Sequence, residues 1–403
     1  MLPLPRRRAG RAMSRGGKGR RLARGPAKRR PAPPRTRPQK AAESPARRGP
    51  SRVERVLVDV LDQIRGRRVV TVTHGAGRFA IEAAKARNDR TVDCVSLDAF
   101  LASRCLDEAD NLASDDVDGR PRLRVLCQPD LPTENYDVAV VPAPAGTEAE
   151  LTRDWLQQAY SRLVDRGRLI AATDGDKDHG LRREFEKYCP NPTRIASSDG
   201  VVLLGTKLGD GPKPKSFDAE FPANVAGQPL RVATRPGVFS HRDVDQAARA
   251  LAESLPEDAD LPPGATLDLG CGSGVIAFVM TRVYPGRDVV AADSNPRALE
   301  AVGRGGSLNG LRPIETVLTT DARVPGAGRF ALVAGNPPYF SDFRIATLFL
   351  DSANEAILPG GVVLMVTKRP EWFLNEMSAR FDGVDGVPMR NYGVMWGFGR
   401  GTD

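Results

Sequence analysis

The run GATLDLGCGSGVIAF, residues 264–278, constrains the fold of this chain more than any other part of its sequence. A short apolar strand ends near Asp268, glycines follow at alternate positions, and an apolar helix begins at once. Glycine lets the backbone approach a ligand, and the start of a helix offers free N–H groups. A strand, a glycine-rich turn and a helix in this order are typical of doubly wound α/β sheets. The run therefore predicts a Rossmann-like α/β fold with a ligand at the end of this strand.

A carboxylate follows the next apolar strand. Residues 288–292 predict that strand, and Asp293 stands at its end, where a carboxylate can accept both hydroxyls of a ribose. The GxGxG spacing, with Asp268 two residues ahead, differs from the GxGxxG of nicotinamide dehydrogenases. These two motifs together indicate an adenosine-containing ligand.

A third apolar strand leads into Asn336-Pro337-Pro338-Tyr339, within FALVAGNPPYF at residues 330–340. Two prolines fix two φ angles and remove two donors, so the loop is stiff and its carbonyl groups stay free. The amide oxygen of Asn336 and a proline carbonyl can together accept both hydrogens of a planar NH₂ group. The ring of Tyr339 can stack on the attached base. The loop thus predicts a site for an exocyclic amine.

These motifs resemble the class I S-adenosylmethionine-dependent methyltransferases, and within them the amino-methylating branch with the (N/D)PP(Y/F) motif. The closer resemblance is to the guanine-N2 ribosomal RNA methyltransferases of the small-subunit type, in the methyltransferase small domain group. Further stretches, covering with the motifs residues 230–370, support it: Pro236 to Ser240 with Asp245, Asp342 to Ile345 with Phe349, and Leu358 to Gly361.

The resemblance implies S-adenosylmethionine as the cofactor and ribosomal RNA, or a ribosomal subunit, as the partner. It implies that the methionine part is held by Asp268, Gly270, Gly272 and Gly274. It also implies that Asp293 holds the ribose, Asp321 in TTDARV the adenine amino group, and Asn336, Pro337 and Tyr339 the target amine. The reaction would be a direct displacement of the sulfonium-bound methyl group by nitrogen, with no metal required.

The chain contains an internal repeat at the scale of a domain. A shift of 195 residues places Gly75 to Gly77 on Gly270 to Gly272, Asp98 on Asp293, and VAVVPAP on VAGNPPY. We expect a first repeat (residues 51–206), a linker (residues 207–221) and a second repeat (residues 222–403). In this alignment, Asp268, Gly274, Asn336 and Tyr339 are replaced by Thr73, Phe79, Val141 and Pro144. The first repeat is therefore expected to be a degenerate, inactive copy, as in the guanine-N2 family, serving RNA positioning or structural support.

Charge separates the amino-terminal 50 residues from the rest. They hold 14 Arg, 3 Lys and one acid, Glu43, for a net charge of +16, whereas the remaining residues carry 42 basic and 49 acidic side chains, or −7. Nine prolines and six glycines in this tail leave too little apolar surface to offset the entropy of ordering. We expect a disordered tail that binds RNA phosphates; a solubilising extension, with Met13 as an alternative start, is the other interpretation.

The remaining composition bounds the class of protein. No window approaches the ~18 uncharged apolar residues of a membrane-spanning helix, so we expect a cytoplasmic protein with no membrane contact. Five scattered cysteines without a CxxC pair and three histidines favour neither a disulfide framework nor a zinc site. Two fused, similar domains can act as a pseudo-dimer, which predicts a monomer.

Alternative functions remain open from the residues. A protein glutamine N5-methyltransferase also presents an amide to an NPPY loop, and a DNA adenine methyltransferase would need a separate target-recognition region that the sequence does not indicate. A non-catalytic RNA-binding scaffold would not need the intact cofactor motif. The degenerate copy and the basic tail favour an RNA enzyme.

Overall fold

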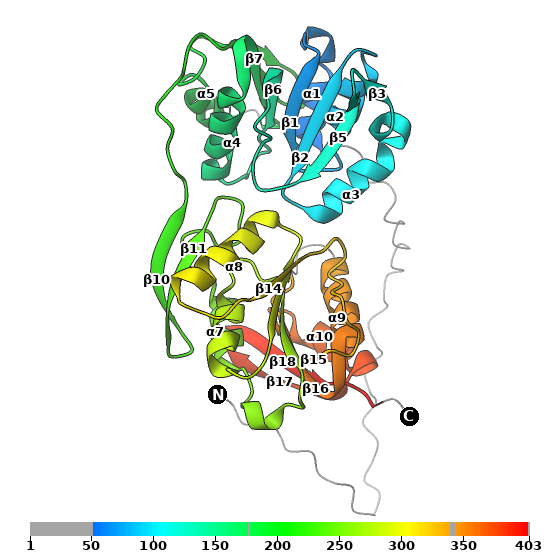
Figure 1. Ribbon diagram of the computed structural model, residues 1–403, viewed down its shortest axis with the longest axis vertical. Helices are drawn as coiled ribbons and strands as arrows, with labels where there is room; N and C mark the ends of the chain where they lie inside the picture. Colours follow the sequence, from blue (N-terminus) through cyan, green and yellow to red (C-terminus); the bar gives the residue numbers. More distant parts are fainter. Residues whose placement is uncertain (1–50, 176–177, 339–342, 402–403) are drawn as a thin grey trace, which may run out of the picture. The chain divides into compact units, whose positions relative to one another are not determined.

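The computed structural model describes residues 51–175, 178–338 and 343–401, and these residues form two seven-stranded sheets with their helices (Figure 1). The fold is that of tandem Rossmann-like domains, as the sequence predicts. The expected basic tail and Tyr339 lie outside the described residues. Among the described residues, no helix is long and apolar enough to cross a membrane.

The first repeat contains a mixed sheet in the order β5-β2-β1-β6-β7-β9-β8, in which β8 and β9 are antiparallel to their neighbours. Its main elements are α1 (Arg52–Val58), β1 (Arg68–Thr73), α2 (Arg78–Lys85), β2 (Thr91–Ser96), α3 (Ala99–Glu108), β5 (Leu123–Cys127), β6 (Tyr136–Pro142), α4 (Ala149–Ser161), β7 (Leu163–Thr173), α5 (His179–Phe185), β8 (Thr193–Ala196) and β9 (Val201–Thr206). A two-residue pair, β3 (Asp116–Val117) and β4 (Arg120–Pro121), precedes β5.

Both faces of this first sheet are covered. Val69 packs into one hydrophobic cluster with residues of α1, α2 and α3, while its neighbour Val70 packs into another with residues of α4 and α5. Successive residues of a strand point to opposite faces, so β1 serves two cores at once. All of its residues from Val69 to Thr73 are therefore buried.

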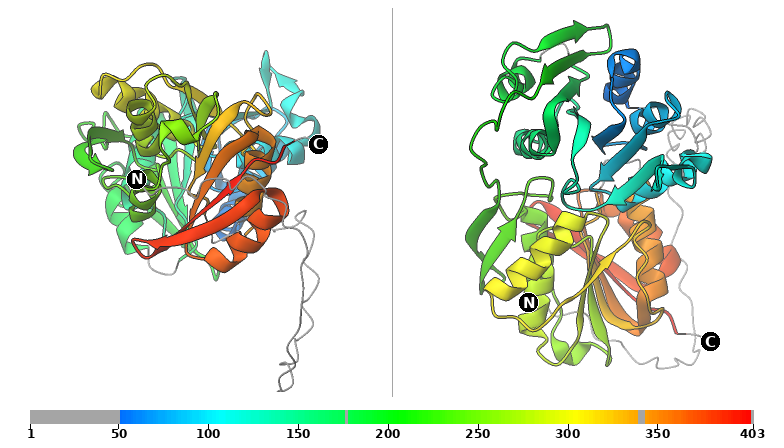
Figure 2. Two further views of the ribbon diagram at one scale, coloured as in Figure 1. Left: turned by 90° about the horizontal axis from the view of Figure 1, so that it is seen from below. Right: turned by 45° about the horizontal axis from the view of Figure 1, so that its top comes forward.

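The second repeat has the corresponding order, β14-β13-β12-β15-β16-β18-β17. Figures 1 and 2 show helices on both sides of its sheet. Its elements are β12 (Ala265–Leu269), α7 (Val275–Val283), β13 (Val289–Asp293), α8 (Pro296–Leu308), β14 (Glu315–Leu318), β15 (Phe330–Gly335), α9 (Arg344–Ala356), β16 (Ile357–Thr367), α10 (Pro370–Arg380), β17 (Asp382–Met389) and β18 (Tyr392–Phe398). Before them come the hairpin of β10 (Ala219–Val225) and β11 (Gln228–Thr234) and the helix α6 (Gln246–Glu253). Strand β10 thus begins inside the segment expected to be a linker.

The matching strand orders support a duplication, but the gapless shift of 195 residues is wrong in detail. Gly77 and Gly274 are the left-handed N-caps of α2 and α7, and Asp98 and Asn295 are the N-caps of α3 and α8. Both pairs differ by 197 residues. A slip of two residues keeps the same side chains on the same face of a strand, so the apolar pattern alone did not exclude it.

Candidate functional site

The glycines at the end of β12 adopt backbone conformations that other residues avoid. Their φ angles are 75° at Gly270, 51° at Gly272 and 81° at Gly274. A Cβ at Gly270 would lie 2.7 Å from Phe349 Cζ, and one at Gly274 would lie 2.8 Å from Phe278 Cζ. A Cβ at Gly272 would meet no atom within 4 Å, so this glycine faces open space that a ligand can fill. The turn is thus packed on two sides and open at its centre.

Asp268 joins this turn to the helix that follows it. Its side chain is 2% exposed, and Oδ2 accepts a hydrogen bond of 2.9 Å from the backbone N–H of Ala277 in α7. Burial raises the pKa of Asp268 to about 7, while the Ala277 hydrogen bond partly opposes that shift. The carboxylate is therefore in a place where a cationic group would be strongly favoured.

Asp293 stands at the end of β13 and holds the glycine turn from the other side. Its Oδ2 accepts from Gly272 N–H and its Oδ1 from Asn295 N–H, both at 2.9 Å. Burial raises the pKa of Asp293, and these backbone donors counteract the shift. The structure thereby brings Asp268, the glycine turn and Asp293 together at one edge of the sheet, where parallel α/β sheets bind their ligands.

Asp321 follows β14 at the same edge. The backbone N–H of Thr319 donates to the Asp293 carbonyl at 3.0 Å, which ties the two loops together. The Asp321 side chain is 46% exposed, and its Oδ1 accepts from Arg323 N–H at 3.3 Å. Asp321 is therefore next to Asp293 along the edge, with its carboxylate half open to solvent.

Asn336 begins the loop after β15, where its amide group has a fixed partner. Its Nδ2 donates to Oδ2 of Asp245 at 3.1 Å, and the same oxygen caps α6 by accepting from Ala247 N–H and Ala248 N–H. Because the amide nitrogen is engaged, the Asn336 oxygen is left as an acceptor. Pro337 is buried beside it.

Asp245 is the site residue whose role the sequence did not indicate. It appeared there only as part of a family stretch. An acid directly before an apolar helix is a recognisable N-cap, so the capping role was readable. Its contact with Asn336 spans 91 residues of chain and has no local signal.

The model of the methyltransferase small domain matches residues 229–394, which include the glycine turn, Asp293 and Asn336. Residues 229–394 are therefore similar to the methyltransferase small domain. The match covers the second repeat only, as expected if the first repeat has diverged.

The similarity to curated relatives extends beyond that domain. Ribosomal RNA small subunit methyltransferase C of Ectopseudomonas mendocina is 29% identical over 246 residues, covering 59% of this chain and 71% of the relative. The protein of the same name from Stutzerimonas stutzeri is 28% identical over 240 residues, covering 57% and 69%. A solved T. thermophilus 16S rRNA N2 methyltransferase, in complex with AdoMet and guanosine, has a TM-score of 0.70 at 22% identity and covers 86% of this chain and 92% of its own. That coverage shows that both repeats share its fold.

In the first repeat, the equivalent positions lack the carboxylates and the amide of the site. Strand register and helix caps place Thr71 at Asp268, Ser96 at Asp293 and Pro142 at Asn336. Ser96 Oγ accepts from Asp98 N–H just as Asp293 accepts from Asn295 N–H, which supports this equivalence. The sequence-based pairings with Thr73, Asp98 and Val141 are therefore corrected.

The expectation that Phe79 replaces Gly274 is also wrong, because Gly77 takes the place of that glycine as N-cap of α2. The first repeat loses its ligand site by another route. The side chain of Glu54, 2% exposed, reaches from α1 to accept a 2.8 Å hydrogen bond from Thr73 Oγ1. A Cβ at Gly75 would lie 3.0 Å from Glu54 Oε2. A side chain of the chain itself thus covers the glycine turn.

Two arginines of the second repeat, Arg297 and Arg235, contact the first repeat. Arg297 in α8 is fully buried; it donates to the carbonyl groups of Pro129 and Pro236, lies 2.7 Å from Asp154 Oδ2, and stacks 4.5 Å from the centre of the Trp155 ring. Every one of these partners except Pro236 belongs to the first repeat. Arg297 is therefore a buried anchor between the repeats.

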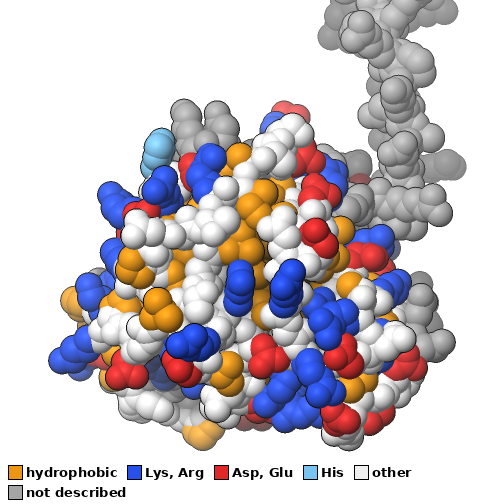
Figure 3. All heavy atoms as spheres, turned by 90° about the horizontal axis from the view of Figure 1, so that it is seen from above, with side chains coloured by type: hydrophobic (Ala, Val, Ile, Leu, Met, Phe, Trp, Pro, Cys, Tyr) orange, Lys and Arg blue, Asp and Glu red, His pale blue; other side chains and the backbone are white. Residues whose placement is uncertain are grey.

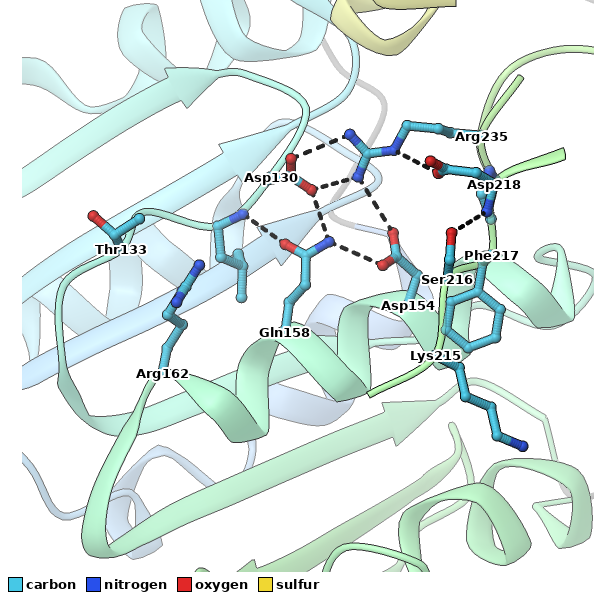
Figure 4. Close-up of a pocket in the computed structure, with 12 residues that line it drawn as sticks. Asp130, Thr133, Asp154, Gln158, Arg162, Lys215, Ser216, Phe217, Asp218 and Arg235 are labelled. Carbon is cyan, nitrogen blue, oxygen red and sulfur yellow. Dashed lines mark hydrogen bonds and ion pairs between the residues drawn. The ribbon is translucent and has the colours of Figure 1, made fainter. Parts of the chain in front are cut away.

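Arg235 is the second of these arginines, and Figure 4 shows its guanidinium paired with Asp130, Asp154 and Asp218. It donates to Asp130 of the first repeat at 3.1 Å and to Glu300 of the second at 2.9 Å. A cavity of about 410 Å³ adjoins this network, and its lining includes polar groups already paired with one another, such as Asp154 with Gln158 and with Arg235. Its chemistry is that of a polar interface.

Proposed function

We propose that this protein is an S-adenosylmethionine-dependent methyltransferase that methylates the N2 amino group of a guanine in ribosomal RNA. The observation that carries the proposal is the pairing of Asn336 with Asp245 beside an open glycine turn. This pairing presents an amide oxygen, fixed in orientation, next to a place for a nucleoside cofactor. The names of the curated relatives and the fold shared over both repeats support the RNA substrate.

The residues present fit the cofactor. The open space at Gly272 admits a ligand at van der Waals distance from the backbone, and Asp268 provides a buried negative charge for the methionine ammonium group. Asp293 is placed for the ribose hydroxyls and Asp321 for the adenine amino group. When bound, the cofactor supplies an electrophilic methyl group on a sulfonium.

The chain's own contribution to the reaction is orientation. The Asn336 oxygen and the Pro337 carbonyl accept the two hydrogens of the guanine amino group, which holds its nitrogen lone pair toward the methyl group. The same acceptors stabilise the positive charge that develops on nitrogen. Tyr339 is proposed to stack on the base.

Outside the site, we assign bulk RNA affinity to the tail and specificity to the folded repeats. Figure 3 shows Lys and Arg side chains interspersed with Asp and Glu on the face seen from above Figure 1. A net charge of +16 in residues 1–50 would bind phosphates without sequence preference. A monomer acting in the cytoplasm, where ribosomal subunits mature, completes the proposal.

Substitution of Asn336→Ala tests the function. We expect methylation of ribosomal RNA to fall at least about 100-fold, because the amine loses its acceptor, while calorimetry shows cofactor affinity within twofold of wild type. Mass spectrometry of nucleosides from treated RNA identifies the product, and N2-methylguanosine is expected. A methylated protein glutamine, or no cofactor binding by the wild type, would replace this proposal by the glutamine or scaffold alternative.

A further inference from the structure

The loop of residues 236–245 runs between the two halves of the candidate site. Near its start, the Gly237 carbonyl accepts a 2.7 Å hydrogen bond from Nδ2 of Asn295, two residues after Asp293. At its end, Asp245 binds Asn336. The loop therefore connects the proposed ribose end of the site to the proposed amine end.

The first repeat holds this loop from outside. Glu148 Oε2 accepts from Gly237 N–H at 2.9 Å, and Glu150 Oε2 accepts from Arg242 Nε at 2.8 Å. His241 lies between them, with Nε2 3.1 Å from Glu150 Oε2 and its side chain 5% exposed. Both glutamates come from the start of α4.

These contacts form a clamp. Glu148, Glu150 and His241 lie close enough together to hold a metal ion, but donors of the loop already occupy one oxygen of Glu148 and both oxygens of Glu150. The Arg242 guanidinium lowers the pKa of Glu150, as an ion pair does. The contacts with the loop of residues 236–245 therefore explain why Glu148, Glu150 and His241 lie close together.

The clamped loop adopts a conformation that an unconstrained chain would avoid. Ser240 and Arg242, neither of them glycine, have φ angles of 58° and 74°. Strained backbone of this kind persists where surrounding contacts over-determine it, and it gathers at ligand-binding segments. The strain is maintained by contacts that come from the other repeat.

Within this rigid loop, one apolar side chain points to solvent. Val238 is 3% exposed, whereas the adjacent Phe239 is 67% exposed. Phe239 follows Gly237 by two residues, so its Cα lies within about 7 Å of the Gly237 Cα. An aromatic ring is therefore held open to solvent beside the site, on a loop with little freedom to bury it.

We propose that Phe239 is a stacking platform for a base of the RNA substrate, held in place by Glu148 and Glu150 of the first repeat. The inference rests on the proposed function. Bases of single-stranded or extruded nucleotides bind exposed aromatic rings by stacking, and any base has a face that can do so. The first repeat then has a part in substrate binding although its own ligand site is filled.

Substitution at Phe239 tests the platform, with the full chain and ribosomal RNA as the probe. Phe239→Ala is expected to raise the Kd for RNA by about 10-fold, and Phe239→Trp to retain wild-type affinity, because a ring is restored. Phe239→Leu keeps the apolar character without the ring and should behave like the alanine variant. Leu208→Ala, at an apolar side chain that is 78% exposed in the linker, is the matched control and should leave the Kd unchanged.

Two further measurements separate this inference from its rivals. The Phe239→Trp variant adds a tryptophan whose fluorescence can be followed during binding. Quenching by RNA, with no change on adding S-adenosylmethionine alone, supports the platform. Quenching by S-adenosylmethionine alone assigns the ring to the cofactor and overturns the proposal. Equal RNA affinity of the alanine variant and an active wild type would also overturn it while leaving the proposed function intact. An inactive wild type would instead refute the proposed function.

The clamp has its own test. Glu150→Gln removes the charge that binds Arg242 but keeps the shape of the side chain. We expect the Kd for RNA to rise several-fold, with unchanged cofactor affinity and an unchanged melting temperature. An RNA affinity equal to that of wild type would show that the first repeat does not support the platform.

Discussion

The Asp245 carboxylate both caps helix α6 and binds a residue of the candidate site. Its Oδ2 receives two backbone N–H groups of α6 and the Asn336 amide. A helix cap is rigid because its donors are fixed in the backbone, and that rigidity is passed to Asn336. The orientation of the amine acceptor therefore depends on a helix end.

Asp245→Ser separates these two tasks. Serine is a good N-cap, but its shorter side chain does not reach Asn336. We expect the free energy of unfolding to change by less than about 1 kcal/mol, while kcat falls about 10-fold or more and cofactor Kd is unchanged. Denaturant unfolding, single-turnover methylation and calorimetry measure the three quantities. Weaker cofactor binding without a change in kcat would show that Asp245 serves the cofactor instead.

Asp268 gives the site a pH dependence. A raised pKa of about 7 means that much of this carboxyl is protonated below neutral pH in the free protein. We expect the Kd for S-adenosylmethionine to fall as pH rises from 6 to 8, because only the ionised form attracts the ammonium group. Asp268→Asn should bind weakly at every pH, and an equal pH profile in the variant would contradict the assignment.

The same shift acts on stability with the opposite sign. The unfolded chain releases this proton near its ordinary pKa of 3.8, whereas the folded protein keeps it until about 7. The contribution to stability is therefore complete at low pH and is lost as pH rises through 7. Because S-adenosylmethionine binds more tightly at higher pH, the increase in melting temperature that it causes should be larger at pH 8 than at pH 6.

At the scale of the element, the glycine turn combines a packing demand with a binding demand. Gly274→Ala adds a Cβ against Phe278 and Val302 in a left-handed conformation, so we expect a loss of at least about 2 kcal/mol of stability. Gly272→Ala meets open space and should lose only about 1–2 kcal/mol, from its φ angle. Its cofactor affinity should nevertheless fall more than about 10-fold. Urea unfolding and calorimetry together distinguish the two; intact cofactor binding by Gly272→Ala would place the ligand elsewhere.

Elements encoded by a short stretch of sequence could be predicted, whereas contacts between distant elements could not. The strand, turn and helix around Asp268 are encoded within fifteen residues, so their order and their ligand-binding role could be predicted locally. Pairs such as Asn336 with Asp245 depend on strands and loops meeting in space, and no periodicity records them. The predicted alignment of the two repeats was wrong for a related reason, because a slip of two residues leaves the apolar pattern of a strand unchanged.

At the scale of the molecule, α8 offers an internal comparison. Arg297→Met removes a buried cation and leaves Asp154 with only Arg235, at 4.0 Å, as an ion-pair partner, so we expect a loss of about 3–5 kcal/mol. Arg304→Ala, on the same helix, breaks an exposed pair with Asp218 and should cost less than about 1 kcal/mol. Thermal and denaturant unfolding of both variants measure the difference. Equal losses would mean that the repeats do not depend on this anchor.

Protein synthesis proceeds from the amino terminus, so the partners of Arg297 in the first repeat are made before Arg297 itself. The first repeat leaves the ribosome before α8 has been made, and at about 5–20 residues per second the interval is on the order of 10 s. The Pro129 carbonyl, Asp154 and Trp155 have therefore all been synthesised when the guanidinium emerges. The first repeat, which is synthesised earlier, therefore offers a binding surface on which the second repeat can fold.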